Sequence, residues 1–171
     1  MGQYFIPIIL DATEDFVRTW FDPHTHDIGY KLMEHSYIYN KFMWAVEKEL
    51  SPQGRFYKCR VVWSGDYAKD SFHLKTDQHN FSSTLSCNMM NYKYVVNHTK
   101  GCYFDKSAHY ESIQGIHPLP ILTAEGNGLS RGDYQGTHME LVGTWAQDVI
   151  SVEREPPPDF KLLECDFQYE I

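Results

Sequence analysis

Apolar and polar residues alternate along two segments of the chain, residues 57–63 and residues 163–169. Successive side chains of a β-strand point to opposite faces of the sheet, so this alternation predicts strands with one buried face. We therefore predict a strand in each segment and expect its apolar side chains to be mostly buried. These side chains are Tyr57, Cys59, Val61, Trp63, Leu163, Cys165, Phe167 and Tyr169.

Strand signals also occur elsewhere in the chain. The β-prone runs 92–97 and 102–104 flank a short polar loop that ends in Gly101, which predicts a hairpin. The β-branched and aromatic run 3–10 predicts another strand, but it contains Pro7. Because proline has no backbone N–H to donate across a ladder, we expect this strand to lie at the sheet edge or to carry a bulge.

One segment has a helical period. Apolar residues recur on one face between residues 32 and 50, and the turn-forming segment 51–54 follows. The positions that share this face are Tyr39, Met43, Val46 and Leu50. We therefore predict one main helix over residues 32–50. The preceding stretch, residues 13–30, has no clean period and includes a polar loop.

Two further segments complete the expected architecture. The apolar run 119–124 predicts a short buried strand, and residues 141–152 predict one or two strands around Trp145. The chain then has about six or seven strands and one main helix, a combination typical of α+β proteins. We predict a single α+β domain over residues 1–171 with a mostly antiparallel sheet.

Charge and composition narrow the classes of partner and compartment. The formal net charge of −8 disfavours non-specific nucleic-acid binding, which needs a clustered basic face. The first residues carry no basic segment, and the apolar run 6–10 is too short for a signal peptide or a membrane span. The 4 cysteines are widely spaced, as in a reduced protein. We expect a cytoplasmic protein that binds neither membrane nor nucleic acid.

The glycine-rich segment 125–134 is the strongest candidate for ligand chemistry. Its glycines let backbone amides approach a ligand closely, and Arg131 offers a forked pair of donors to a phosphate or carboxylate. The segment matches neither the dinucleotide-binding motif nor the Walker motif, so a plain surface loop is the alternative. The residues that we expect to bind a ligand are Glu125, Asn127, Arg131, Asp133, Tyr134 and Trp145.

A second candidate is the cluster of His24, His26 and Asp27. Positions i and i+2 of a strand face the same way, so both imidazoles would meet one metal ion there. An H-x-H pair does not define a metal site by itself, and no third ligand has a diagnostic spacing. We therefore expect a solvated loop, with neither a metal nor another cofactor. The chain also lacks a G-x-S-x-G elbow, and we assign no catalytic residue.

Several islands of sequence resemble those of an uncharacterised family of small proteins from bacteria and their phages. The islands are MGQY at the start, KLMEHSY at 31–37, WSGDYA at 63–68, VNHTK at 96–100, and LTAEGNG at 122–128 continuing through GDY to VGTWA at 142–146. Family members are more glycine-rich where this chain has residues 129–131. The resemblance implies a phage or mobile-element setting and no established activity.

These observations lead to one functional hypothesis and two alternatives. We expect a non-catalytic binding protein that antagonises host defence by sequestering a small anionic nucleotide signal. The step from setting to function is an analogy, supported by Arg131 and by aromatic side chains that can stack on a base. The alternatives are an inhibitor or immunity-type protein that binds a host protein, and a metal-assisted phosphoesterase that uses His24, His26 and Asp27. The oligomeric state is left open.

Overall fold

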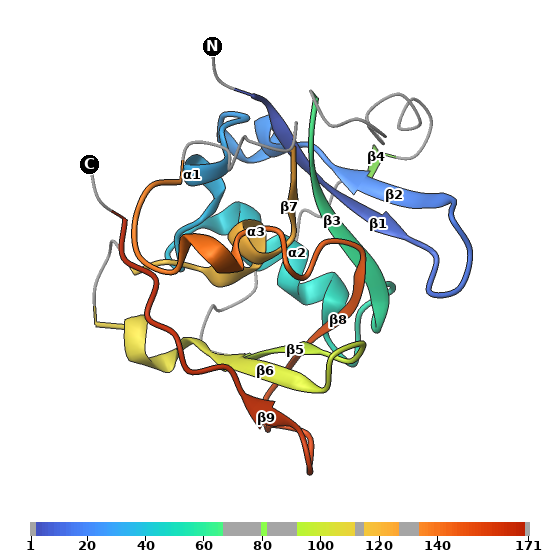
Figure 1. Cartoon of the computed structure of the whole chain (residues 1–171). Coiled ribbons are helices and arrows are strands. Elements are labelled where there is room, and N and C mark those ends of the chain that lie inside the picture. The colour runs from blue at the N-terminus through green and yellow to red at the C-terminus, as the bar shows by residue number, and fades with distance from the viewer. Residues whose placement is uncertain (1–2, 67–79, 82–91, 112–114, 127–133, 170–171) are drawn as a thin grey trace.

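The computed structural model describes residues 3–66, 80–81, 92–111, 115–126 and 134–169 (Figure 1). The elements along the chain are β1 (Phe5–Leu10), β2 (Val17–Phe21), η1 (Pro23–His26), α1 (Leu32–His35), α2 (Lys41–Leu50), β3 (Cys59–Gly65), β4 (Asn80–Phe81), β5 (Tyr94–Asn97), β6 (Cys102–Asp105), η4 (Lys106–His109), α3 (Pro118–Leu122), β7 (Ala124–Glu125), η5 (Met139–Leu141), β8 (Asp148–Glu153) and β9 (Lys161–Leu162).

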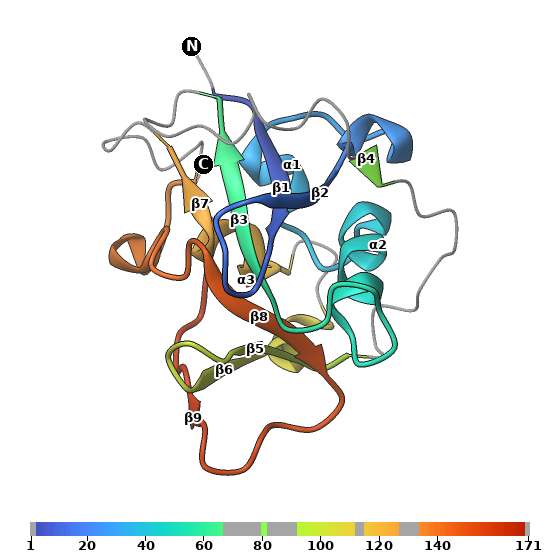
Figure 2. The same cartoon turned by 90° about the vertical axis from the view of Figure 1, so that its right-hand side faces the viewer.

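All the described strands belong to one mixed sheet in the order β4-β2-β1-β3-β8-β5-β6-β9, with β7 paired to β3. The short strands β4, β7 and β9 pair in parallel, and the longer strands pair antiparallel. Figures 1 and 2 show β8 linking the β1–β3 part of the sheet to the β5–β6 part, with the helices packed between them. The prediction of a single α+β domain with a mostly antiparallel sheet is confirmed.

Strand β3 lies at the centre of the sheet and is buried on both faces, so the prediction of a single buried face is wrong for this strand. Val61 and Trp63 pack in the main core against the helices, while Val62 belongs to a second apolar cluster on the opposite face. The predicted burial of this segment is confirmed for Cys59, Val61 and Trp63, whereas Tyr57 precedes the strand and is half-buried. The predicted hairpin is also confirmed, as β5 and β6.

The edge position expected from Pro7 is wrong, but the alternative, a bulge, is present, because the register between β1 and β2 shifts between Ile9 and Leu10. Strand β1 lies between β2 and β3, and Pro7 pairs in register with Trp63 of β3. On the other side the ladder with β2 begins only at Ile8, and the Phe5 N–H donates to the Tyr30 carbonyl there. Because positions i and i+2 face the same way, the Pro7 nitrogen points to this unpaired part, and no ladder bond is lost.

The predicted helix over residues 32–50 is two helices, α1 and α2, separated by residues 36–40. In the break, Tyr37 forms a bridge with Ile116, and the Ile38 N–H donates to the Gly115 carbonyl. Asn40 then begins α2, because its side chain accepts hydrogen bonds from the first-turn N–H groups. Pairing with a distant segment therefore interrupts the helix that the local period favours.

The prediction of a strand over residues 119–124 is wrong. These residues form helix α3, which has Pro118 in its first turn and His117 as its N-cap, and only Ala124 and Glu125 form a strand. Proline is well suited to the first helical turn because its missing N–H has no partner there in any case. A short buried apolar run alone does not distinguish a strand from a helix.

The prediction of a strand over residues 163–169 is also wrong. The strand here, β9, ends at Leu162, and the following segment has one isolated bridge between Gly136 and Tyr169. Thr137 holds the segment in place, since its backbone and hydroxyl exchange three hydrogen bonds with Asp166 and Gln168. Of the apolar side chains expected to be buried, Phe167 is buried and the others are half-buried.

The predicted strand over 141–152 is β8, and Trp145 lies in the turn before it.

Two features bear on the expected compartment. The helices in the described part of the chain are too short or too polar to cross a membrane. Cys59, Cys102 and Cys165 are free thiols, and burial raises the pKa of each. For Cys165 the pKa rises to about 11, so this thiol stays protonated at neutral pH.

The main core contains a histidine whose charge state follows from its hydrogen bonds. The indole N–H of Trp63 donates to Nδ1 of His35 over 2.9 Å. Nδ1 is therefore the acceptor, and Nε2 donates to the Gly29 carbonyl over 2.7 Å. This is the neutral imidazole, in agreement with burial, which lowers the pKa of His35 to about 4 despite the Gly29 carbonyl.

The free energy of unfolding should therefore fall as the pH falls. Above about pH 6.5, His35 is neutral in both the folded and the unfolded protein. Between about pH 6.5 and pH 4, His35 becomes protonated in the unfolded chain but stays neutral in the folded protein, which favours unfolding. We expect a loss of roughly 3 kcal/mol from this residue between these pH values. Urea titrations of the protein and of His35→Gln, which keeps an acceptor and a donor but does not titrate, measure it. Equal pH slopes for the two proteins would contradict the assignment.

Candidate functional site

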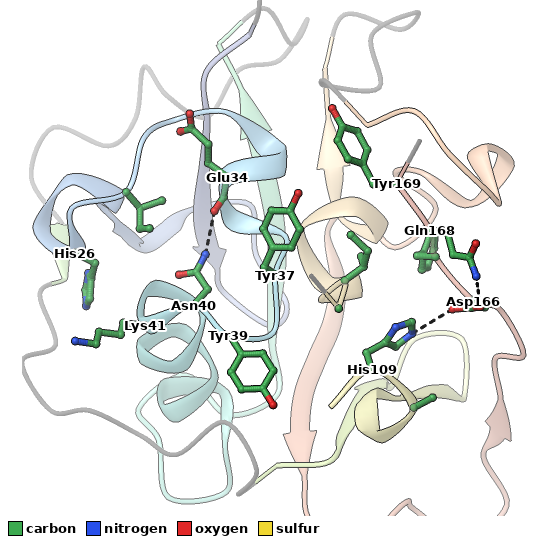
Figure 3. A pocket seen from close by; sticks show the side chains of 15 residues that line it. His26, Glu34, Tyr37, Tyr39, Asn40, Lys41, His109, Asp166, Gln168 and Tyr169 are labelled. Atoms are coloured by element: carbon green, nitrogen blue, oxygen red, sulfur yellow. Dashed lines mark hydrogen bonds and ion pairs between the residues drawn. The ribbon is translucent and has the colours of Figure 1, made fainter. Parts of the chain in front are cut away.

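A pocket of about 930 Å³ opens between two parts of the molecule that are far apart in sequence (Figure 3). One wall is formed by η1, α1 and the start of α2. The other is formed by η4 and by residues 166–169 near the C-terminus, and residues 115–116 also line the pocket. This volume is near the upper end of the range for small-molecule sites in proteins, roughly 300 to 1,000 Å³.

The first wall presents His26 and Lys41. The His26 ring packs against Phe42 at a centroid distance of 5.6 Å, and Lys41 is the exposed first residue of α2. The Asn40 side chain, on the same wall, has all its hydrogen-bonding groups occupied. Its carbonyl oxygen accepts from two α2 N–H groups, and its amide donates to the Glu34 and His35 carbonyls. Asn40 therefore shapes this wall, and Nδ1 of His26 is hydrogen-bonded to the Thr25 hydroxyl, so the exposed Lys41 is the group that can face a ligand.

The second wall presents a linked set of polar groups. Nε2 of His109 lies 3.6 Å from Oδ1 of Asp166, and the Gln168 amide donates to Oδ2 of Asp166 over 2.8 Å. The His109 ring stacks on Phe104, with 15° between the ring planes. Figure 3 shows these side chains across the pocket from His26 and Lys41. Asp166 thus has one hydrogen bond from Gln168 and a longer contact with His109, while its side chain remains 63% exposed.

Tyrosine rings lie between and beside these walls. Tyr39 has 43% of its surface exposed, and its hydroxyl donates to the Tyr110 carbonyl, which holds the ring in place. Tyr37 and Tyr169 also line the pocket, and Tyr169 stacks loosely on Tyr134. Burial, with a smaller contribution from the charge of Glu47, raises the pKa of Tyr110 to about 12. The pocket therefore combines aromatic faces with polar groups.

A buried polar network links elements that also line the pocket. Glu47 of α2 accepts hydrogen bonds from the Lys106 ammonium, at 2.7 Å, and from Nε2 of His117, and all three side chains are inaccessible to solvent. Burial by itself would raise the pKa of Glu47, but these two partners outweigh it and lower the pKa. Nδ1 of His117 accepts from the Leu119 N–H, so His117 is neutral, and burial lowers its pKa accordingly.

This network joins the elements that carry the pocket. Lys106 begins η4, which continues to His109, and His117 follows the lining residues Gly115 and Ile116. Glu47 lies on α2, whose first residue is Lys41. One carboxylate therefore ties three parts of the pocket lining to each other.

The residues expected from the glycine-rich loop are distributed differently. Asn127, Arg131 and Asp133 lie outside the described residues, so their expected role stays a prediction. Glu125 is half-buried and accepts a hydrogen bond from the Gln147 amide over 2.8 Å. Tyr134 and Trp145 are buried in the main core, and none of these three described residues lines the pocket.

The local fold directs the side chains of His24 and His26 toward different neighbours. His24, His26 and the intervening residue lie on η1 rather than on a strand. The His24 ring packs on Tyr30 at 4.3 Å, whereas His26 packs on Phe42, so the two imidazoles face different neighbours. Among the described residues no group of three or more His, Cys, Asp or Glu side chains is placed to hold a metal ion.

Sequence reasoning did not identify the pocket residues other than His26. Tyr39 was expected on the buried face of a long helix, but the break at residues 36–40 leaves it exposed beside the pocket. Lys41, His109 and Asp166 carry no local motif. They come from segments whose proximity depends on tertiary packing, and no spacing along the chain could have indicated it.

No family model matches the chain, and no curated protein or solved structure matches it either.

The buried network should be important for stability. Lys106→Met leaves the Glu47 carboxylate buried with a single donor, and breaking such a pair typically costs about 3 to 5 kcal/mol. The matched control is Lys100→Met, which removes an ion pair with Asp148 whose lysine is partly exposed. That pair should contribute less than about 1 kcal/mol. Chemical denaturation measures the free energy of unfolding of both variants. Similar losses for the two variants would show that the buried pair contributes no more to stability than the exposed pair.

Proposed function

We propose that this protein is a non-catalytic binding protein that captures a small nucleotide-type ligand in the pocket between the α1–α2 wall and the η4–C-terminal wall. The observation that carries the proposal is that an exposed tyrosine ring, Tyr39, and the ammonium group of Lys41 line the same pocket. Within the described part of the chain, Lys41 has no ion-pair partner.

The chemistry of the lining supports a ligand with an aromatic ring and an anionic group. Every nucleobase has a π-face that can stack on a tyrosine, which contributes roughly 1 to 3 kcal/mol per base. A lysine ammonium provides a charged donor for a phosphate. The remaining polar groups, such as Gln168 and Tyr169, offer hydrogen bonds to the sugar or to the edge of the base.

The state of the polar groups favours capture over turnover. Asp166 is engaged by both His109 and Gln168, and Asn40 has no free hydrogen-bonding capacity. The described residues that line the pocket include no serine, threonine or cysteine to serve as a nucleophile. These features fit a site that holds its ligand without changing it.

The biological role in this proposal comes from the resemblance to small phage and bacterial proteins. A phage protein that sequesters a nucleotide signal lowers its free concentration and so prevents activation of a host defence enzyme. This step is an analogy of setting, and the pocket supports only the binding itself.

Calorimetry with purified protein tests the proposal. We expect one adenine nucleotide to bind per pocket, and mass spectrometry should recover it unchanged. Tyr39→Ala should weaken binding by roughly 1 to 3 kcal/mol, because the stacking face is lost. The control is Tyr4→Ala, which removes an exposed tyrosine that does not line the pocket.

Three outcomes would contradict the proposal. No heat with mononucleotides, cyclic dinucleotides or ADP-ribose would exclude nucleotide capture and favour the alternative of a protein inhibitor. Equal losses for Tyr39→Ala and Tyr4→Ala would place the ligand elsewhere. Recovery of a cleaved ligand would show that the protein is an enzyme.

A further inference from the structure

We infer that the pocket selects a ligand whose negative charge is gathered in one phosphate or pyrophosphate group, and that it rejects a cyclic dinucleotide with two separated phosphates. This inference rests on the proposed function and concerns its specificity. It assigns Lys41 as the residue that binds the charged group and Asp166 as the residue that repels a second one.

Among the described residues that line the pocket, the lysine, Lys41, lies on the first wall. Lys41 is exposed at the start of α2, and Figure 3 shows its ammonium beside His26. The N–H groups of Phe42 and Met43 in the first turn are occupied by the Asn40 side chain. The positive charge offered to a ligand here therefore comes from the lysine side chain rather than from the helix backbone.

Glu34, the acidic residue among the described lining residues of this wall, is turned away from Lys41. The Glu34 carboxylate lies against Gly29 and accepts a hydrogen bond from the Lys31 N–H over 3.4 Å. In Figure 3 it points to the end of the wall opposite Lys41. A phosphate beside Lys41 would thus meet a cation, while the acidic residue among the described lining residues of this wall, Glu34, points away from it.

The opposite wall carries the opposing charge. The Asp166 side chain is 63% exposed, and its partners are His109, at 3.6 Å, and the neutral amide of Gln168. A phosphate on this side of the pocket would therefore face a like charge, which raises the free energy of binding.

The position of the tyrosine completes the argument. Figure 3 shows Tyr39 between the two walls, with its hydroxyl end held at the Tyr110 carbonyl. A base stacked there can extend one phosphate group toward Lys41. A cyclic dinucleotide carries its two phosphates on opposite sides of a ring, so placing one at Lys41 directs the other toward the Asp166 wall.

Calorimetry with adenine ligands tests the inference while the base is held constant. We expect ADP and ADP-ribose to bind at least about tenfold more tightly than cyclic di-AMP, because only their charge is gathered in one group. Lys41→Ala should weaken ADP binding by about tenfold. Lys48→Ala, on the same helix but outside the pocket, should leave it unchanged.

Asp166→Asn provides the complementary measurement. The variant keeps an acceptor for Gln168 and removes the charge, so binding of cyclic di-AMP should tighten several-fold while that of ADP stays nearly the same. Circular dichroism should show that the exposed substitutions at positions 41 and 166 leave the fold intact.

The results separate the inference from the proposed function. If cyclic di-AMP binds as tightly as ADP, or if Lys41→Ala has no effect on ADP binding, the inference is wrong and nucleotide capture still stands. If Asp166→Asn fails to tighten cyclic di-AMP, the repulsive role of Asp166 is wrong. If no adenine ligand binds, both the inference and the proposed function fall.

Discussion

The arrangement around the pocket depends on one buried carboxylate, that of Glu47. A charged group without solvent is costly to fold around unless it is paired, and Lys106 and His117 provide that pairing from two other parts of the chain. The geometry must be satisfied by all three residues at once, so α2, η4 and the segment before α3 are held in one relative position. A hydrophobic contact would be less directional and would tolerate sliding of these elements.

The distribution of charged groups also distinguishes the two walls of the pocket. The core histidines His35 and His117 are held neutral by their hydrogen bonds. At the surface, Lys41 stands on one wall and Asp166 on the other. A polar pocket with its charges separated in this way can choose between ligands by where their charge lies, as well as by how much they carry.

Local patterns predicted elements correctly where the local preference and the tertiary contacts agree. The alternation around Val61 and the turn at Gly101 led to β3 and to the β5–β6 hairpin, both of which have ladder partners on each flank. The alternation over 163–169 failed because that segment forms hydrogen bonds with Thr137 instead of a strand. The helical period over 32–50 failed at residues 36–40, where pairing with residues 115–116 replaces the helix.

The sequence by itself determined the class of the fold, the central strand, the hairpin and the second half of the long helix, because each depends on the spacing of residues close together in the chain. It also indicated that charge and aromatic rings are available for a ligand. Only the tertiary structure decided where they meet. Tyr39, Lys41 and His109 lie in one pocket because the buried Glu47 network and the Tyr37–Ile116 bridge bring their segments together. Asp166 lines the same pocket on a segment that Thr137 holds in place. The network and the bridge join residues about 60 to 80 positions apart, a separation at which local propensity has no influence.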